Sequence, residues 1–122
     1  MDLELHTAFD PARDSVRAVI ESVRSRVAVV PAPEYDRFEN SFLHIFQGGY
    51  AAGYYGYKWA EVLAADAFGR FEEEGIFSAT AARAFRDTVL ARGGSEDYLG
   101  LFVRFRGRAP ESAALLRPAG IT

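Results

Sequence analysis

The chain has 122 residues, 49% hydrophobic and 25% charged, which is ordinary for a single globular domain. Its 14 basic and 17 acidic residues give a net charge of −3, so it lacks the basic excess of a nucleic-acid surface. It has no cysteine and only two histidines, His6 and His44, which excludes disulfides and disfavours a zinc site built within the chain.

The first part of the chain predicts one amphipathic helix. Residues 2–9 contain apolar side chains but form no complete element. Asp10 and Pro11 are typical of a helix N-cap followed by its first helical position. Apolar residues then recur at helical spacing, at Val16, Val19, Ile20, Val23 and Val27. Two prolines, Pro31 and Pro33, end this helix and start an extended connection.

The middle of the chain predicts one long helix from about Gly53 to Gly75. Its apolar residues point nearly all round, which predicts burial on every side. Charged residues interrupt the apolar stretch at 50–68, so it is not typical of a membrane span. The few helices left in the chain are too short to cover such a helix, which indicates that part of its natural surroundings is missing.

Shorter helices are predicted after residue 75. Ser78 is a suitable cap for a helix that reaches about Arg92, and Ser95 with the acidic residues after it marks another helix, which stops near Gly107. A last short helix covers Ser112–Arg117. Because no alternating strand pattern is found, the predicted fold is all-α: a small helical bundle around one long buried helix.

The segment from His44 to Tyr57 is the candidate for chemistry. On a helix, Tyr50, Tyr54 and Tyr57 would share one face, where neutral hydroxyl donors could polarise a carbonyl or hold a peptide backbone. Glycines at 48, 49, 53 and 56 permit close backbone approach and positive φ. The alternative is that the tyrosines pack in a core, and that His44 is an ordinary hydrogen-bonded histidine.

Other charged or glycine-rich patterns have plainer explanations. The run at 72–74 is typical of a solvated acidic face, and the arginines at 104, 106 and 108 are typical of surface ion pairs. Residues 93–95 indicate a helix–helix turn rather than an anion site. His6 has no local partners that would distinguish it. None of the P-loop, G-x-S-x-G or H-E-x-x-H motifs is present, so nothing in the chain activates water by itself.

Taken together, four segments resemble the C-terminal end of the thimet oligopeptidase family of zinc metallopeptidases, especially its oligopeptidase A and peptidyl-dipeptidase branches. The segments are HIFQGGYAAGYYGYKWAEVLAADAF, FEEEGIF, FRDTVLARGGSED and LFVRFRGRAPESAALLRPAGI. The resemblance covers the whole chain and implies that residues 1–122 are the C-terminal part of a larger, mostly helical catalytic domain. The family's zinc ligands, H-E-x-x-H and a later glutamate, lie upstream of the region resembled. We therefore expect zinc in the intact enzyme but not in this chain, which should be inactive alone.

The resemblance also implies roles for individual residues. Tyr57 matches a tyrosine that donates to the developing oxyanion, and His44 matches a histidine that helps to bind the substrate or that oxyanion. Tyr50 and Tyr54, with Gly48 and Gly49, match a mobile glycine-rich loop that contacts the peptide. The implied partners are short peptides and the remainder of the catalytic domain, in the cytoplasm, with no nucleic acid and no membrane.

A second hypothesis belongs to a different class. The same excess of apolar and aromatic surface would suit a free-standing helical binding or oligomerisation module without catalytic activity. On that hypothesis the isolated chain forms a homo-oligomer.

Overall fold

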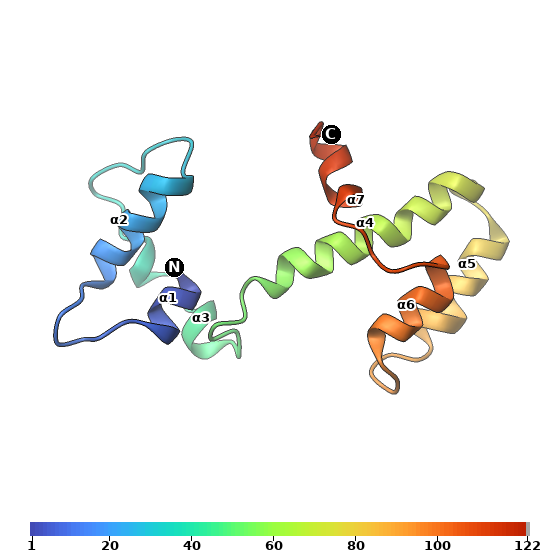
Figure 1. Ribbon diagram of the computed structural model, residues 1–122, viewed down its shortest axis with the longest axis horizontal. Helices are drawn as coiled ribbons and strands as arrows, with labels where there is room; N and C mark the ends of the chain where they lie inside the picture. Colours follow the sequence, from blue (N-terminus) through green and yellow to red (C-terminus); the bar gives the residue numbers. More distant parts are fainter. Residues whose placement is uncertain (122) are drawn as a thin grey trace. The chain divides into compact units, whose positions relative to one another are not determined.

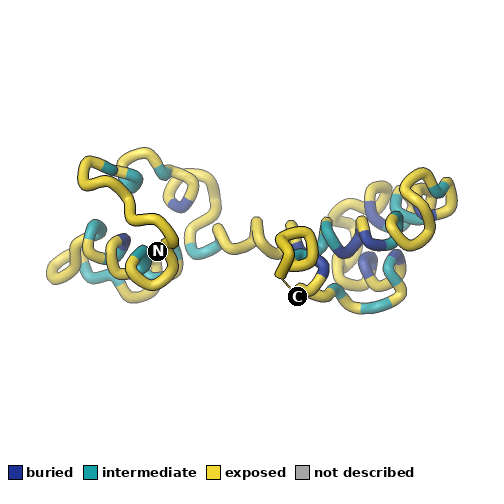
Figure 2. Tube along the Cα trace, turned by 90° about the horizontal axis from the view of Figure 1, so that it is seen from above, coloured by how far each residue is buried: buried dark blue, intermediate teal, exposed yellow. Residues whose placement is uncertain are grey.

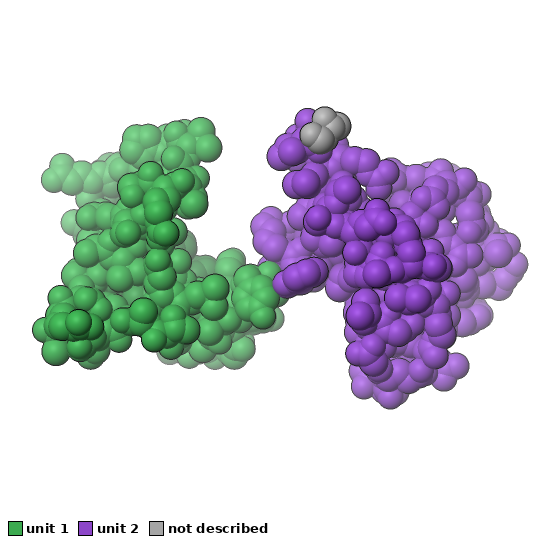
Figure 3. Space-filling view, viewed as in Figure 1, with its two compact units in different colours: residues 1–56 green, residues 57–122 purple. Residues whose placement is uncertain are grey.

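The computed structural model describes residues 1–121, and it contains helices and no strand within that range (Figure 1). The all-α prediction is therefore confirmed. The chain divides into two compact units, Met1–Gly56 and Tyr57–Thr122 (Figure 3). The division falls at the start of the longest helix.

The first unit begins with a short helix, α1 (Asp2–Thr7), in a region where the sequence predicted no complete element. The next helix, α2 (Val16–Val27), covers the predicted apolar run, but Ser15 caps it rather than Asp10. The Asp10 carboxylate instead accepts a hydrogen bond from the Ala12 amide at 2.9 Å, in a separate turn that contains Pro11. The predicted helix start was wrong because Asp10 caps this turn, which ends before the helix begins.

Two arginines of α2 hold the connection that follows it. Arg24 Nη1 lies 2.7 Å from a carboxylate oxygen of Asp36, and Arg17 donates to the Asp36 carbonyl at 2.6 Å. The connection leads to a 3₁₀ turn, η1 (Phe38–Asn40), and to a one-turn helix, α3 (His44–Gln47). Among the described residues of this unit, the buried apolar side chains are Ile20 and Ile45.

The longest helix, α4 (Gly56–Glu74), ends just before Gly75 as predicted, and Gly75 adopts a φ of 104°. It begins three residues later than predicted because residues 51–55 form turns. The prediction that it is buried on every side was wrong for the described chain, where Trp59 and Phe68 are exposed. Burial is confined to one side of the helix, at Val62, Asp66, Ala67 and Gly69.

Shorter helices complete the second unit. They are α5 (Ala79–Phe85), a π-helical turn η2 (Arg86–Leu90), α6 (Tyr98–Arg106), α7 (Ala113–Leu116) and a 3₁₀ turn η3 (Arg117–Ala119). The predicted cap of α5 is confirmed, because Ser78 Oγ accepts from the Ala81 amide at 3.2 Å. Asp97 rather than Ser95 caps α6, and Gly107 ends that helix with a φ of 81°.

Aromatic side chains dominate the core of the second unit. Ala67 of α4, Val89 of η2, and Phe102 and Phe105 of α6 form its buried centre. The Phe85 and Phe105 rings meet edge to face, with centroids 5.2 Å apart. Figure 2 shows the buried stretches along the helices that contribute these residues. The helices α5 and α6 and the turn η2 therefore supply the packing partners for the part of α4 that carries Ala67.

A buried carboxylate ties the C-terminal part of this unit to α4. Asp66 is 0% exposed, and Arg108 donates to its two oxygens at 2.7 and 2.6 Å. Arg106 Nε also donates to Asp66 Oδ1 at 3.1 Å, and the Glu111 amide donates to Asp66 Oδ2 at 2.8 Å. Burial by itself would raise the pKa of Asp66, but these donors outweigh it and lower the pKa below its usual value. Two of the three arginines predicted to lie in surface ion pairs thus serve a buried acid.

Candidate functional site

The predicted chemistry-bearing residues of the first unit meet in an aromatic cluster, made of Phe38, Phe42, His44, Tyr50 and Tyr54. Measured between ring centroids, Phe42 lies 4.9 Å from Tyr54, edge to face, and 6.0 Å from His44. The His44 centroid lies 6.2 Å from that of Tyr50 and 6.1 Å from that of Tyr54. The Phe38 ring stacks on the Phe42 ring with centroids 4.7 Å apart. The structure therefore brings two of the predicted tyrosines, Tyr50 and Tyr54, next to the imidazole of His44.

Residues 50–56 form two successive turns, which we call the glycine–tyrosine turn. The Gly53 amide donates to the Tyr50 carbonyl at 2.8 Å, and the Gly56 amide donates to the Gly53 carbonyl at 3.0 Å. The spacing had suggested that Tyr50, Tyr54 and Tyr57 share one helical face. This prediction was wrong, because Tyr50 and Tyr54 lie in turns before the helix. Glycine at 53 and 56 favours turns over a continued helix, and this breaks the apparent periodicity.

Two glycines before this turn are required by local geometry. A Cβ atom on Gly48 would lie 3.1 Å from the His44 carbonyl oxygen and 3.2 Å from the Tyr50 ring. Gly49 has a φ of +74°, in the left-handed region that favours glycine. Glycine at position 48 therefore leaves room for the Tyr50 ring beside the His44 backbone.

The tyrosines of the site reach the surface. Tyr50 is 37% exposed and Tyr54 is 38% exposed, and His44 is also exposed. Tyr57 lies in the second unit, in the first turn of α4, and is 42% exposed. Within the described chain, these tyrosines lie outside the buried core.

Asp2 contributes to the site and was missed by the sequence analysis. Its two carboxylate oxygens accept hydrogen bonds from the amides of Ala52 and Tyr54, each at 2.9 Å. His6, one turn further along α1, places Nδ1 3.0 Å from the same carboxylate. Because 50 and 52 residues separate the partners, no local pattern indicates these contacts.

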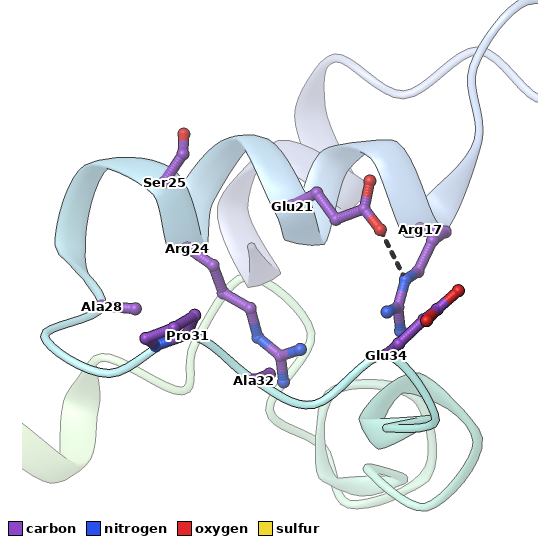
Figure 4. A pocket seen from close by; sticks show the side chains of 8 residues that line it. All are labelled: Arg17, Glu21, Arg24, Ser25, Ala28, Pro31, Ala32 and Glu34. Atoms are coloured by element: carbon purple, nitrogen blue, oxygen red, sulfur yellow. Dashed lines mark hydrogen bonds and ion pairs between the residues drawn. The ribbon is translucent and has the colours of Figure 1, made fainter.

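A separate pocket of about 410 Å³ lies between α2 and the segment that follows it (Figure 4). Arg17 and Arg24 point into it, and they would suit an anionic ligand if they were unpaired. Arg17 Nε instead donates to Glu21 at 2.8 Å, and Arg24 pairs with Asp36 at 2.7 Å. With their charges matched by carboxylates, these arginines give the pocket no excess of positive charge for an anion.

The donor chemistry of the chain does not fit a zinc site. Within residues 1–121, no group of three or more histidine or acidic side chains is placed to hold a metal ion. One of the two histidines, His6, already directs Nδ1 to Asp2. None of the helices that the structure describes is long and apolar enough to cross a membrane.

Comparison with known proteins gives a consistent result over almost the whole chain. The model of peptidase family M3 matches residues 1–121. Oligopeptidase A of Escherichia coli is 52% identical over 121 residues, which are 98% of this chain and 18% of that protein.

More distant relatives agree. A probable cytosolic oligopeptidase A of Arabidopsis thaliana is 48% identical over 126 residues, covering 99% of this chain and 18% of the relative. Dipeptidyl carboxypeptidase of Escherichia coli is 37% identical over 121 residues, which are 98% of this chain and 17% of that relative. The chain thus spans less than a fifth of the length of these curated relatives.

Proposed function

The chain belongs to peptidase family M3, and we propose on that basis that it forms the C-terminal part of a peptidase catalytic domain, where it supplies a substrate-binding wall. The observation that carries the proposal is the exposed cluster of His44, Tyr50 and Tyr54 on a glycine-rich turn. The proposed substrates are short peptides, in line with the oligopeptidase and dipeptidyl carboxypeptidase names of the relatives. The proposed location is the cytoplasm, after a relative named as cytosolic, while another relative of similar identity is named as organellar.

The cluster suits a peptide backbone for chemical reasons. A peptide offers carbonyl acceptors and amide donors, and tyrosine and histidine side chains can hydrogen-bond to either kind of group. Flat rings also contact apolar side chains with little loss of rotamer freedom, because each has only two side-chain torsions. In this proposal, Tyr50 and Tyr54 bind the substrate, His44 helps to orient it, and Gly48 and Gly49 set the loop's path.

Tyr57 is proposed as the residue that stabilises the reaction's developing charge. When a nucleophile adds to a peptide carbonyl, negative charge grows on the oxygen, and a fixed hydroxyl donor stabilises that charge more than the ground state. Loss of one such donor costs about 10²- to 10³-fold in rate. The position of Tyr57 at the start of α4, with 42% of its surface exposed, is compatible with contact to a bound substrate.

The proposal assigns no zinc ligand to this chain. The family resemblance implies a zinc ion, yet the donors present do not form a site for it within the described residues. The ligands are therefore proposed to come from the part of the catalytic domain that the chain does not match. That ion would supply electrophilic and water-activating chemistry, while this chain binds and orients the peptide.

An apolar groove on the second unit supports contact with the rest of such a domain. The groove measures about 390 Å³, and its lining is mostly apolar: Ala60, Leu63, Ala64, Ala67, Phe68, Phe71, Phe85 and Tyr98. Exposed apolar surface of this kind marks a place for a partner. The relatives are more than five times longer than the region matched, so the proposed partner is the remainder of the catalytic domain.

A chimera tests the proposal. Residues 1–122 would replace the matching region of Escherichia coli oligopeptidase A, and hydrolysis of a short quenched peptide would be measured together with zinc content. We expect an active, zinc-containing chimera in which Tyr57→Phe lowers kcat about 10²- to 10³-fold. We expect Tyr54→Phe and His44→Gln chiefly to raise KM.

Tyr35→Phe is the matched control, since Tyr35 is 83% exposed and lies outside the aromatic cluster. A chimera that binds zinc but hydrolyses no peptide would contradict the proposal. Unchanged kinetics in all three site variants would contradict it as well. If the isolated chain self-associates and the zinc-binding part of the relative does not dissociate the oligomer, the oligomerisation-module hypothesis gains instead.

A further inference from the structure

The glycine–tyrosine turn is held by a residue from the opposite end of its unit. Asp2, the first residue of α1, accepts hydrogen bonds from the backbone amides of Ala52 and Tyr54, one to each carboxylate oxygen. The Asp2 side chain is only 13% exposed. Hydrogen bonds to an ionised carboxylate are among the stronger ones in proteins, and two of them fix both position and orientation.

The turn needs such a hold because its backbone is strained. Ala52 has a φ of 54°, the one positive value for a non-glycine residue in the described chain. A side chain is disfavoured in that region, so the conformation persists only when its surroundings fix it. The Ala52 amide is one of the two that Asp2 binds, so one of the two hydrogen bonds acts at the strained residue itself.

Asp2 is in turn oriented by His6. The His6 Nδ1 atom lies 2.9 Å from the Asp2 carbonyl oxygen and 3.0 Å from Asp2 Oδ1, so both acceptors favour a proton on that nitrogen. The His6 ring packs against Phe46 of α3, with centroids 5.5 Å apart. Asp2 thus links α1 to the turn, and His6 links the same helix to α3.

From these contacts we propose that Asp2 is a positioning residue for peptide binding, which holds Tyr54 against Phe42 and His44. The inference rests on the proposed substrate role of that cluster. Asp2 does not itself touch the peptide. It sets the backbone from which the Tyr54 ring projects, and that ring lies 4.9 Å from Phe42 and 6.1 Å from His44.

The first test measures how strongly Asp2 holds the two backbone amides in the 122-residue chain, and it needs no assay of activity. Asp2→Asn keeps the shape but leaves a single, uncharged acceptor oxygen, and its new amide group faces backbone donors. We expect hydrogen exchange at the Ala52 and Tyr54 amides to accelerate about 10- to 100-fold, the range for loss of a hydrogen bond to a charged group. Glu4→Gln, on the same helix but paired with Arg26, is the matched control.

The second test uses the chimera with oligopeptidase A. We expect Asp2→Asn to raise KM for a short peptide about tenfold, with kcat changed less than twofold and zinc content unchanged. Glu4→Gln should leave KM unchanged. A double variant of Asp2→Asn with Tyr54→Phe should be little worse than Tyr54→Phe alone, because both changes act through the same ring.

The outcomes separate this inference from the proposed function. Unchanged amide exchange in Asp2→Asn would show that the carboxylate does not hold the turn, and would overturn the inference. Faster exchange with an unchanged KM would reduce Asp2 to a structural role and would also overturn it, provided that Tyr54→Phe raises KM. If Tyr54→Phe and His44→Gln leave the kinetics unchanged, the proposed function itself fails.

Discussion

The two units of the molecule are stabilised in different ways. The first unit, Met1–Gly56, buries only Ile20 and Ile45 among its described apolar residues. The second unit buries a larger set: Val62, Ala67, Ala81, Val89, Leu101, Phe102, Phe105 and Ala114. The unit that carries the aromatic cluster is thus the one with the smaller core.

Polar contacts compensate for that small core in the first unit. The carboxylate of Asp2 binds the glycine–tyrosine turn, and Arg17 and Arg24 bind the connection after α2. Hydrogen bonds of this kind fix geometry but each contributes modestly to net stability, whereas apolar burial stabilises in proportion to area. A site held mainly by polar contacts can be precise and still open at low cost.

The largest expected effect tests the core of the second unit. Phe102→Ala removes a fully buried ring from the cluster with Phe105, and we expect it to lower the free energy of unfolding by about 3–5 kcal/mol. Phe77→Ala is the control, since Phe77 is 98% exposed in the same unit. Hydrogen exchange resolved by segment should show faster exchange in α4 and α6. Equal acceleration in both units would show that they unfold together and would contradict a difference in stability between them.

The next effect concerns the buried carboxylate. Asp66→Asn leaves Arg106 and Arg108 without their shared anion, and we expect a loss of about 3 kcal/mol in the second unit. Chemical denaturation followed by the fluorescence of Trp59 measures it. Asp87→Asn is the control, because Asp87 forms only an exposed pair with Arg86. A loss for Asp66→Asn no larger than that of the control would contradict the assignment.

The same residue gives a pH dependence with a definite sign. The pKa of Asp66 is lowered in the folded chain, so its stabilisation is fully present above the ordinary aspartate value of about 4 and is lost as the pH falls below it. The difference in unfolding free energy between the original chain and Asp66→Asn should therefore narrow below about pH 4. If this difference in unfolding free energy stays constant as the pH falls below about 4, the result contradicts the lowered pKa of Asp66.

Much of the fold follows from the sequence because its signals are local. The apolar spacing predicted α2, the serine at 78 predicted the start of α5, and the glycine at 107 predicted the end of α6. The N-caps of α2 and α6 were assigned to the wrong residue, because Asp10 caps a separate turn before α2 and Ser95 lies two residues before the actual cap, Asp97. The burial of α4 was overestimated because periodicity shows which residues are apolar and not which partners are present.

The candidate site was predicted in part, because some of its signals are also local. The tyrosines and His44 stand out within a short segment, and the cluster of His44, Tyr50 and Tyr54 is found in the structure. The contacts of Asp2 could not be predicted, because Asp2 and Ala52 are 50 positions apart in the chain. Asp66 was missed likewise, since its partners are 40 and 42 residues away.

A smaller effect tests the backbone of the first unit. Gly49→Ala places a side chain at a φ of +74°, and we expect a local loss of about 1–2 kcal/mol near the glycine–tyrosine turn. Gly56→Ala is the matched control, because a Cβ atom there meets nothing within 4 Å and α4 begins at that residue. It should be neutral or stabilising by about 0.5–1 kcal/mol. Faster hydrogen exchange at residues 50–56 in Gly56→Ala but not in Gly49→Ala would reverse this interpretation.

The smallest effect compares one helix cap from each unit. Ser78 Oγ accepts from the Ala81 amide at 3.2 Å at the start of α5, whereas Ser15 Oγ accepts from the Ala18 amide at 3.5 Å at the start of α2. Replacing a serine cap by alanine costs about 0.5–2 kcal/mol, and the 3.2 Å hydrogen bond of Ser78 has better geometry than the 3.5 Å hydrogen bond of Ser15. We therefore expect Ser78→Ala to cost about 1 kcal/mol and Ser15→Ala about 0.5 kcal/mol, measured by exchange of the first-turn amides. If Ser15→Ala is the more costly of the two, α2 depends on its cap because the core beneath it is small, and the contrast between the units becomes sharper.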